Sequence, residues 1–203
     1  MAFPEFRLVL AMGTAPRVPA RAVTEPALGV AAARPGPGGP AKVIAYPRHE
    51  ATMALNLFEE TMALLAELER HGVPYAVAGA LALAIHGVPR ATTDIDLLVR
   101  REDVDAALRV ASASGFGVQA LPMRFSDGLE VRRSTKVETA EMLTLDLLLV
   151  NDNLEPVWAS RERVPTEGGE VWVVSRRGLI DMKAWAGREQ DLADIRRLRE
   201  LDR

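Results

Sequence analysis

Hydrophobic residues recur at helical spacing at the start of the patterned part of the chain. Four apolar side chains lie three or four positions apart, namely Leu55, Phe58, Met62 and Leu65. Acidic residues occupy positions on the opposite face, which is typical of an amphipathic helix packed on a core. The pattern predicts a helix that ends near His71, where Gly72 is a suitable stop.

The segments that follow alternate between strand-like and helix-like patterns. Strands are expected at 74–79, 92–100, 116–121, 129–138, 142–150 and 170–175. Helices are expected at 80–87 and 101–115, and two more at 176–203 with a break near Gly187. This alternation predicts an α/β (α+β) class in which the helices cover a mixed sheet.

The first 50 residues show neither pattern. They contain eight of the thirteen prolines, and "AAARPGPGGPAK" is typical of a chain that buries too little apolar surface to fold. The expected organisation is a disordered Pro/Ala/Gly-rich tail at 1–50 and one domain at 51–203, and Met53 is an alternative functional start.

Composition narrows the class of protein. The 203 residues are 48% hydrophobic with a net charge of −3, and they include no cysteine. Disulfide scaffolds, thiolate metal sites and cysteine nucleophiles are therefore excluded. The apolar run from Val73 to Ile85 is too short to cross a bilayer, and the N-terminus lacks a signal-peptide pattern. We expect a cytoplasmic protein without a membrane partner.

Two carboxylates interrupt a strand that otherwise looks buried. In "TTDIDLLVR", Asp94 and Asp96 point to one face because strand side chains alternate, while Ile95 and Leu97 point to the other. Adjacent carboxylates repel each other and favour a cation between them, and Mg²⁺ prefers oxygen ligands. An isolated D-x-D is more often a solvated strand edge, so this pair needs support from elsewhere in the chain.

A third carboxylate gives that support. Asp146 stands alone in the apolar strand "MLTLDLLLV". If this strand pairs with the one that carries Asp94 and Asp96, the three carboxylates converge and could hold two metal ions, as in nucleotidyl transfer. The alternative is an edge-strand charge that blocks aggregation.

The stretch "YAVAGALALAIHGVPRATTDIDLLV" resembles the nucleotidyltransferase superfamily that includes DNA polymerase beta. It is similar to the small bacterial nucleotidyltransferases of the abortive-infection toxin type, which combine a glycine turn, a helix, a D-x-D strand and a later strand aspartate. Gly79, Asp94, Asp96 and Asp146 match that pattern. The C-terminal "IDMKAWAGREQDLADIRRL" is similar to the family's lysine-containing helix and its Arg…Asp-x-x-Asp helix. Ala80 departs from the family's usual glycine or serine and removes a possible hydroxyl contact to phosphate.

The resemblance implies a set of roles. The three aspartates would hold two Mg²⁺ ions, and Asp146 would orient the acceptor hydroxyl. The triphosphate of an NTP such as ATP would lie near the remaining positions, namely Gly79, Ala80, Thr92 and Thr93. Lys183 would neutralise the departing pyrophosphate, and Arg188 is expected to pair with Asp191.

The implied activity is Mg²⁺-dependent transfer of a nucleoside monophosphate to an acceptor hydroxyl of RNA or tRNA, a protein or a small molecule. A role in a toxin–antitoxin system with a cognate antitoxin is an additional expectation. One alternative is a catalytically weak nucleotide-binding or antitoxin-like interaction protein, which Ala80 permits. A sugar transferase is another, although it needs no third strand aspartate. Arg124, Arg132, Arg133 and Lys136 form a loose basic group that could guide an RNA or nucleotide acceptor but is most simply a solvated face.

Overall fold

The computed structural model describes residues 55–138 and 141–201. The expected tail at 1–50 lies outside these residues, as does Met53. The helices are α1 (Leu57–Arg70), α2 (Gly79–Ile85), α3 (Val104–Ala113), α4 (Glu155–Ala159), α5 (Arg176–Ala186) and α6 (Glu189–Glu200), with a 3-10 turn η1 (Arg101–Asp103) before α3. The strands are β1 (Ala76–Val77), β2 (Asp94–Val99), β3 (Val118–Gln119), β4 (Met123–Arg124), β5 (Glu130–Glu138), β6 (Glu141–Leu149), β7 (Glu162–Thr166) and β8 (Gly169–Val173).

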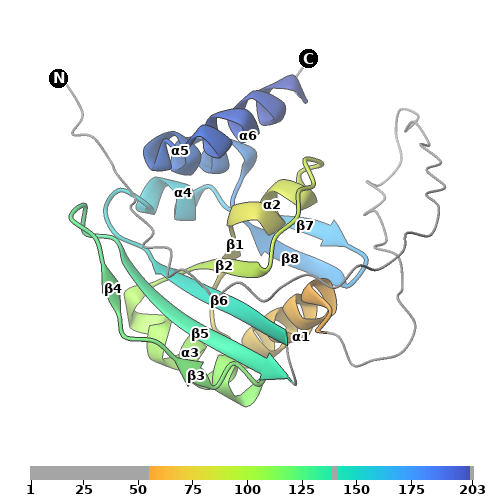
Figure 1. Cartoon of the computed structure of the whole chain (residues 1–203), viewed down its shortest axis with the longest axis vertical. Helices are drawn as coiled ribbons and strands as arrows, with labels where there is room; N and C mark the ends of the chain where they lie inside the picture. Colours follow the sequence, from red (N-terminus) through yellow and green to blue (C-terminus); the bar gives the residue numbers. More distant parts are fainter. Residues whose placement is uncertain (1–54, 139–140, 202–203) are drawn as a thin grey trace, which may run out of the picture. The chain divides into compact units, whose positions relative to one another are not determined.

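The strands form one mixed sheet in the order β3-β5-β6-β2-β1-β8-β7, and β4 pairs with β5 (Figure 1). Two pairs of neighbours are parallel, β2 with β6 and β1 with β8. The remaining neighbours are antiparallel. The expected α+β class with a mixed sheet is confirmed.

Local signals explain where several helices begin and end. Asn56 caps α1 by accepting hydrogen bonds from the backbone N–H groups of Phe58 and Glu59. Gly187 ends α5 with a φ of 64°, a left-handed conformation that glycine adopts without strain. The predicted break between the last two helices is therefore confirmed at this residue.

Apolar side chains of the sheet and of the helices that cover it form the core. On β2 and β6, Ile95, Leu97, Leu145 and Leu147 are almost fully buried. They share the face covered by α1 and α3, since Lys136 of β5 points to that face and hydrogen-bonds Glu60 of α1. The opposite face of the same strands carries Asp94, Asp96 and Asp146 together with Leu98 and Leu148.

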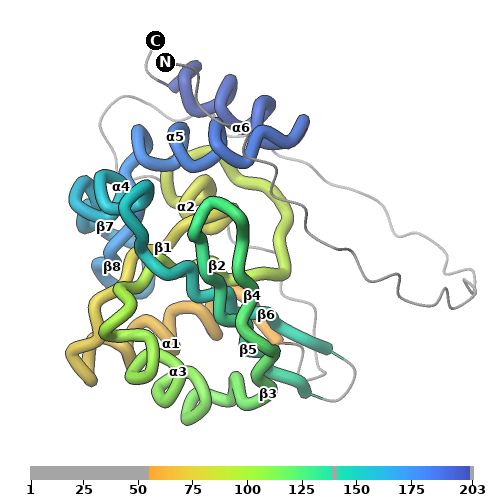
Figure 2. The backbone as a smooth tube through the Cα atoms, turned by 90° about the vertical axis from the view of Figure 1, so that its left-hand side faces the viewer, coloured from red at the N-terminus to blue at the C-terminus, as the bar shows by residue number. Residues whose placement is uncertain are grey.

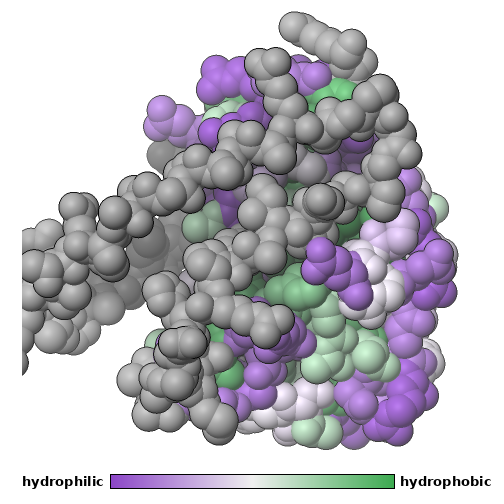
Figure 3. All heavy atoms as spheres, turned by 90° about the vertical axis from the view of Figure 1, so that its right-hand side faces the viewer, coloured by the Kyte–Doolittle hydropathy of each residue, from purple (hydrophilic) through white to green (hydrophobic). Residues whose placement is uncertain are grey.

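The helices divide into two groups around the sheet. Figures 1 and 2 show α5 and α6 side by side at the end of the view opposite α1 and α3. Figure 3 shows hydrophilic and hydrophobic residues side by side on the described part of one face, with hydrophilic residues frequent along one edge. Over the described ranges, no helix combines the length and hydrophobicity needed to span a membrane.

Candidate active site

The parallel pairing of β2 with β6 brings the predicted carboxylates together. Asp96 and Asp146 are register partners, and Asp94 lies two residues before Asp96 on the same face. Neighbouring strands are about 4.8 Å apart, so the Asp96 and Asp146 side chains stand next to each other. The structure thus gathers three carboxylates, from two strands, on the face of the sheet that α1 and α3 leave free.

Asp146 is paired with an arginine on the next strand. Arg133 of β5 is the antiparallel register partner of Asp146. Its Nε donates to Asp146 Oδ1 at 2.8 Å and its Nη2 donates to Oδ2 at 2.7 Å. Both oxygens of the third carboxylate are therefore engaged in a charge-assisted bidentate pair. The sequence showed Arg133 only as one member of a basic group.

The surroundings of Asp96 disfavour the ionised form of its carboxyl group. Its pKa is raised to about 6, first by burial and then by the charges of Asp146 and Asp94, while Lys183 and Arg188 oppose the rise. Desolvation and like charges both disfavour the ionised carboxylate, and a cation near Asp96 would restore its charge.

Gly79 leaves room for Asp96. Its φ is 59°, and a Cβ added there would lie 1.9 Å from Asp96 Oδ2. Any side chain at this position would collide with the carboxylate. The Gly79 backbone thus lies close to Asp96, and its expected approach to phosphate stays a prediction.

The other three predicted nucleotide-contacting residues lie around the start of β2 and of α2. Thr92 accepts a hydrogen bond from the backbone N–H of Asp94 at 3.2 Å, and Thr93 is exposed beside Asp94. Ala80 is buried at the start of α2. Their contacts with a nucleotide remain predictions.

Lys183 lies in a buried ion network at the corner between α5 and α6. Its Nζ lies 2.7 Å from Asp194 Oδ2 and 3.2 Å from Asp191 Oδ1. Arg188 Nε donates to Asp191 at 2.6 Å, which is the pairing expected from the sequence. The sequence did not show that Arg90, before β2, also reaches this network, with its Nε 3.7 Å from Asp194 Oδ2.

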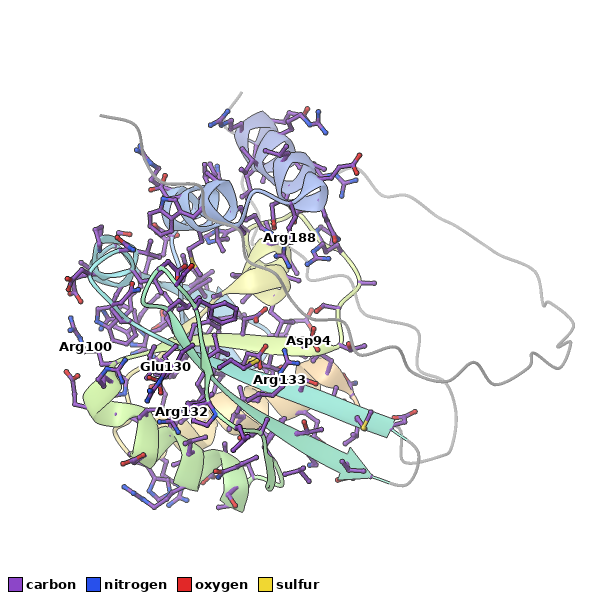
Figure 4. All side chains as sticks on the ribbon, turned by 60° about the vertical axis from the view of Figure 1, so that its left-hand side comes forward. Asp94, Arg100, Glu130, Arg132, Arg133 and Arg188 are labelled. Carbon is purple, nitrogen blue, oxygen red and sulfur yellow. The ribbon has the colours of Figure 1, made fainter. Side chains whose placement is uncertain are left out.

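The network faces the carboxylates. Both Lys183 and Arg188 lower the pKa of Asp96 through their charges. Figure 4 shows Arg188 at the base of the α5–α6 pair, on the side of the sheet where Asp94 and Arg133 lie. Since Lys183 is buried between two aspartates and Arg188 is half-exposed, Arg188 is the more accessible cation of the two.

The three aspartates carry the oxygen ligands that a hard divalent ion prefers, but they are not arranged as a three-ligand metal site. Asp94 and Asp96 offer carboxylate oxygens, the ligands that Mg²⁺ prefers, and the raised pKa of Asp96 marks a place where a cation is favoured. In the part of the chain that the structure describes, no three acidic, histidine or cysteine side chains converge to hold a metal ion. Asp146 instead contacts Arg133.

The basic group seen in the sequence separates into three parts. Arg133 faces the carboxylates, whereas Arg124 and Arg132 contact the buried carboxylate of Glu130 on the other side of β5 (Figure 4). Lys136 contacts Glu60 and Glu138. The group therefore does not form one surface.

Two comparisons with known proteins give no match, since no family model and no curated protein is similar to the sequence. Solved structures do match. A proposed nucleotidyltransferase from Thermotoga maritima, TM1012, gives a TM-score of 0.51 at 18% identity over 69% of this chain and 90% of that one. The lincosamide antibiotic adenylyltransferase LnuA, solved with lincomycin, gives 0.49 at 13% identity over 70% and 95% of the two chains.

The likeness to TM1012 concerns the fold, because the identity is low. It agrees with the mixed sheet in which β2 and β6 run parallel and carry the aspartates. This chain therefore has the nucleotidyltransferase fold.

Proposed function

We propose that the protein transfers a nucleoside monophosphate from an NTP to an acceptor hydroxyl, with Mg²⁺ as its metal. The observation that carries this proposal is the in-register pair of Asp96 and Asp146 beside Asp94, on the free face of a nucleotidyltransferase sheet. A carboxylate cluster placed this way has no role in the core, and charge repulsion makes it costly unless a cation binds.

In this reaction the residues would have separate roles. Asp94 and Asp96 would hold the ion, which when bound would neutralise charge on the nucleotide phosphates. Asp146 would orient the acceptor hydroxyl. Arg188, half-exposed and close enough to Asp96 to affect its pKa, would face the departing pyrophosphate. Lys183 would act through Asp191 and Asp194, by fixing the corner from which Arg188 projects.

The test is a transfer assay with each of four α-³²P-labelled NTPs and Mg²⁺. Total RNA, cell lysate protein and small hydroxylated compounds serve as separate acceptors. Label should appear in one acceptor class with the wild type and be lost at least 10²-fold in Asp96→Asn. Arg177→Gln, an exposed change on α5, is the matched control and should retain activity. Equal labelling by wild type and Asp96→Asn would exclude transfer at this site.

One observation favours a second candidate, a nucleotide-binding protein with weak catalysis. Arg133 engages both oxygens of Asp146, the residue expected to orient the acceptor. Such a protein, as a nucleotide sensor or an antitoxin-like component, would bind an NTP in equilibrium dialysis and label no acceptor. Growth arrest on expression of wild type but not of Asp96→Asn would instead favour the toxin role.

A further inference from the structure

The pairing of Arg133 with Asp146 is built into the sheet. The two residues are direct cross-strand partners on β5 and β6, and both nitrogen–oxygen distances are below 2.9 Å. The Asp146 side chain is 12% exposed and that of Arg133 is 34% exposed. A bidentate pair this shielded from water is stronger than a surface ion pair and fixes both side chains.

Arg133 also interacts with the other two carboxylates. Its pKa is raised above the usual value, chiefly by the hydrogen bond to Asp146, and the charges of Asp146, Asp94 and Asp96 contribute further. The guanidinium is therefore a cation of the carboxylate cluster, and it engages both oxygens through which Asp146 could bind a metal ion.

The formal charges of these residues indicate how many divalent metal ions the cluster can bind. Three carboxylates and one guanidinium carry two net negative charges, which a single divalent ion balances. The nearby network of Lys183, Arg188 and Arg90 with Asp191 and Asp194 carries one net positive charge, so it provides no negative charge for a second ion. A second divalent ion would meet an already neutral cluster and would have to displace Arg133 from Asp146.

We infer that Arg133 takes the place of one of the two metal ions expected at such a carboxylate triad, so that the chain binds one divalent ion, through Asp94 and Asp96. This inference rests on the proposed metal-dependent function. Arg133 is then a positioning residue that holds Asp146, and it sets the number of ions that the site accepts.

The experiment counts ions without using activity. Mn²⁺ alone is titrated into the full-length chain, and bound ions are measured from the loss of the free-ion EPR signal. The wild type should bind one ion and Arg133→Gln two, because the second carboxylate pair is then free. Arg133→Gln with Asp146→Asn should return to one.

The neighbouring residue gives a matched control. Arg132 is on the same strand but points to the other face, where it pairs with Glu130, so Arg132→Gln should bind one ion like the wild type. Asp146→Asn alone, which does not require Arg133 to be removed, should also retain one ion at saturation. Circular dichroism and melting curves check that each variant is folded.

The outcomes separate the two proposals. Two ions in the wild type, one ion in folded Arg133→Gln, or loss of the ion in Asp146→Asn would each overturn the role of Arg133 and leave the proposed function standing. No bound ion in the wild type would overturn the metal-dependent function and, with it, the inference.

Discussion

At the scale of single residues, Gly79 and Asp96 depend on each other. Gly79 has a φ of 59° and would place a Cβ 1.9 Å from Asp96 Oδ2. Gly79→Ala should therefore combine backbone strain with displacement of the carboxylate, and lower the free energy of unfolding by about 2 kcal/mol or more. Urea denaturation followed by circular dichroism measures this.

Gly72 is the matched control for that change. Its φ is 64°, but a Cβ there would meet nothing within 4 Å. Gly72→Ala should cost only the backbone strain, about 1 kcal/mol. If both variants lose the same free energy of unfolding, the close approach of Gly79 to Asp96 does not contribute to the loss.

Asp96 also predicts how stability changes with pH. Its pKa rises from an ordinary 3.8 to about 6 on folding, so the folded chain binds the extra proton between these values. Stability should then fall as pH increases from about 4 to 6, by up to about 3 kcal/mol, and stay low above that range. The measurement is the urea midpoint from pH 4 to 8.

Asp96→Asn isolates this contribution from those of other groups. The variant cannot ionise, so its stability relative to the wild type should increase between pH 4 and 6 and remain constant above pH 6. Addition of Mg²⁺ above pH 6 should raise the midpoint of the wild type and not that of the variant. A difference that does not change with pH would show that Asp96 titrates normally.

At the scale of elements, the corner between α5 and α6 is held by charge. Lys183 is buried between Asp191 and Asp194. Lys183→Ala leaves two buried carboxylates without that partner, and should destabilise the fold by about 3 kcal/mol or more. Any loss of transfer activity in this variant has to be read against its stability, measured by thermal and urea unfolding.

Arg177 provides the comparison on the same helix. It pairs with Asp181 at the i,i+4 spacing and its side chain is 85% exposed. Arg177→Ala should change stability by no more than about 0.5 kcal/mol, as is typical of surface pairs. Similar losses for the two variants would contradict a structural role for the buried network.

Many of the helices and strands could be predicted from the sequence. Strong periodicity and glycine stops located α1, α3, α5 and the carboxylate strands, because these signals are local. α4 and β7 were not anticipated. α4 has five residues, too few for a helical period, and β7 is an edge strand that includes Pro165.

The site was predictable in part for a related reason. Strand alternation places Asp94 and Asp96 on one face, but the strand that pairs with the strand of Asp146 depends on sheet topology, which local patterning does not define. The bond from Arg133 to Asp146 depends on the register of β5 with β6, and hydrophobic patterning defines faces without defining partners. Lys183 was noticed as a cation, yet its burial between two aspartates required the α5–α6 geometry.

For the whole molecule, residues 53–203 should be sufficient for folding. Every buried apolar residue of the described core lies between Leu64 and Leu198, while the first 50 residues contain eight prolines. A chain starting at Met53 should melt within about 3 °C of the full chain, a shift below 1 kcal/mol for a domain of this size. A drop of 10 °C or more in differential scanning calorimetry would show that the preceding residues contribute to the fold.

The sheet order also affects the path by which the protein folds. Arg133 and Asp146 are 13 residues apart in a hairpin, whereas Asp96 and Asp146 are separated by 50 residues and meet only when β6 docks beside β2. Local pairings close before distant ones because they lose less chain entropy. We therefore expect Asp146 to reach β2 already neutralised, which would lower the kinetic barrier to bringing two like charges together. Loss of Arg133 would slow folding, independently of any effect on the finished site.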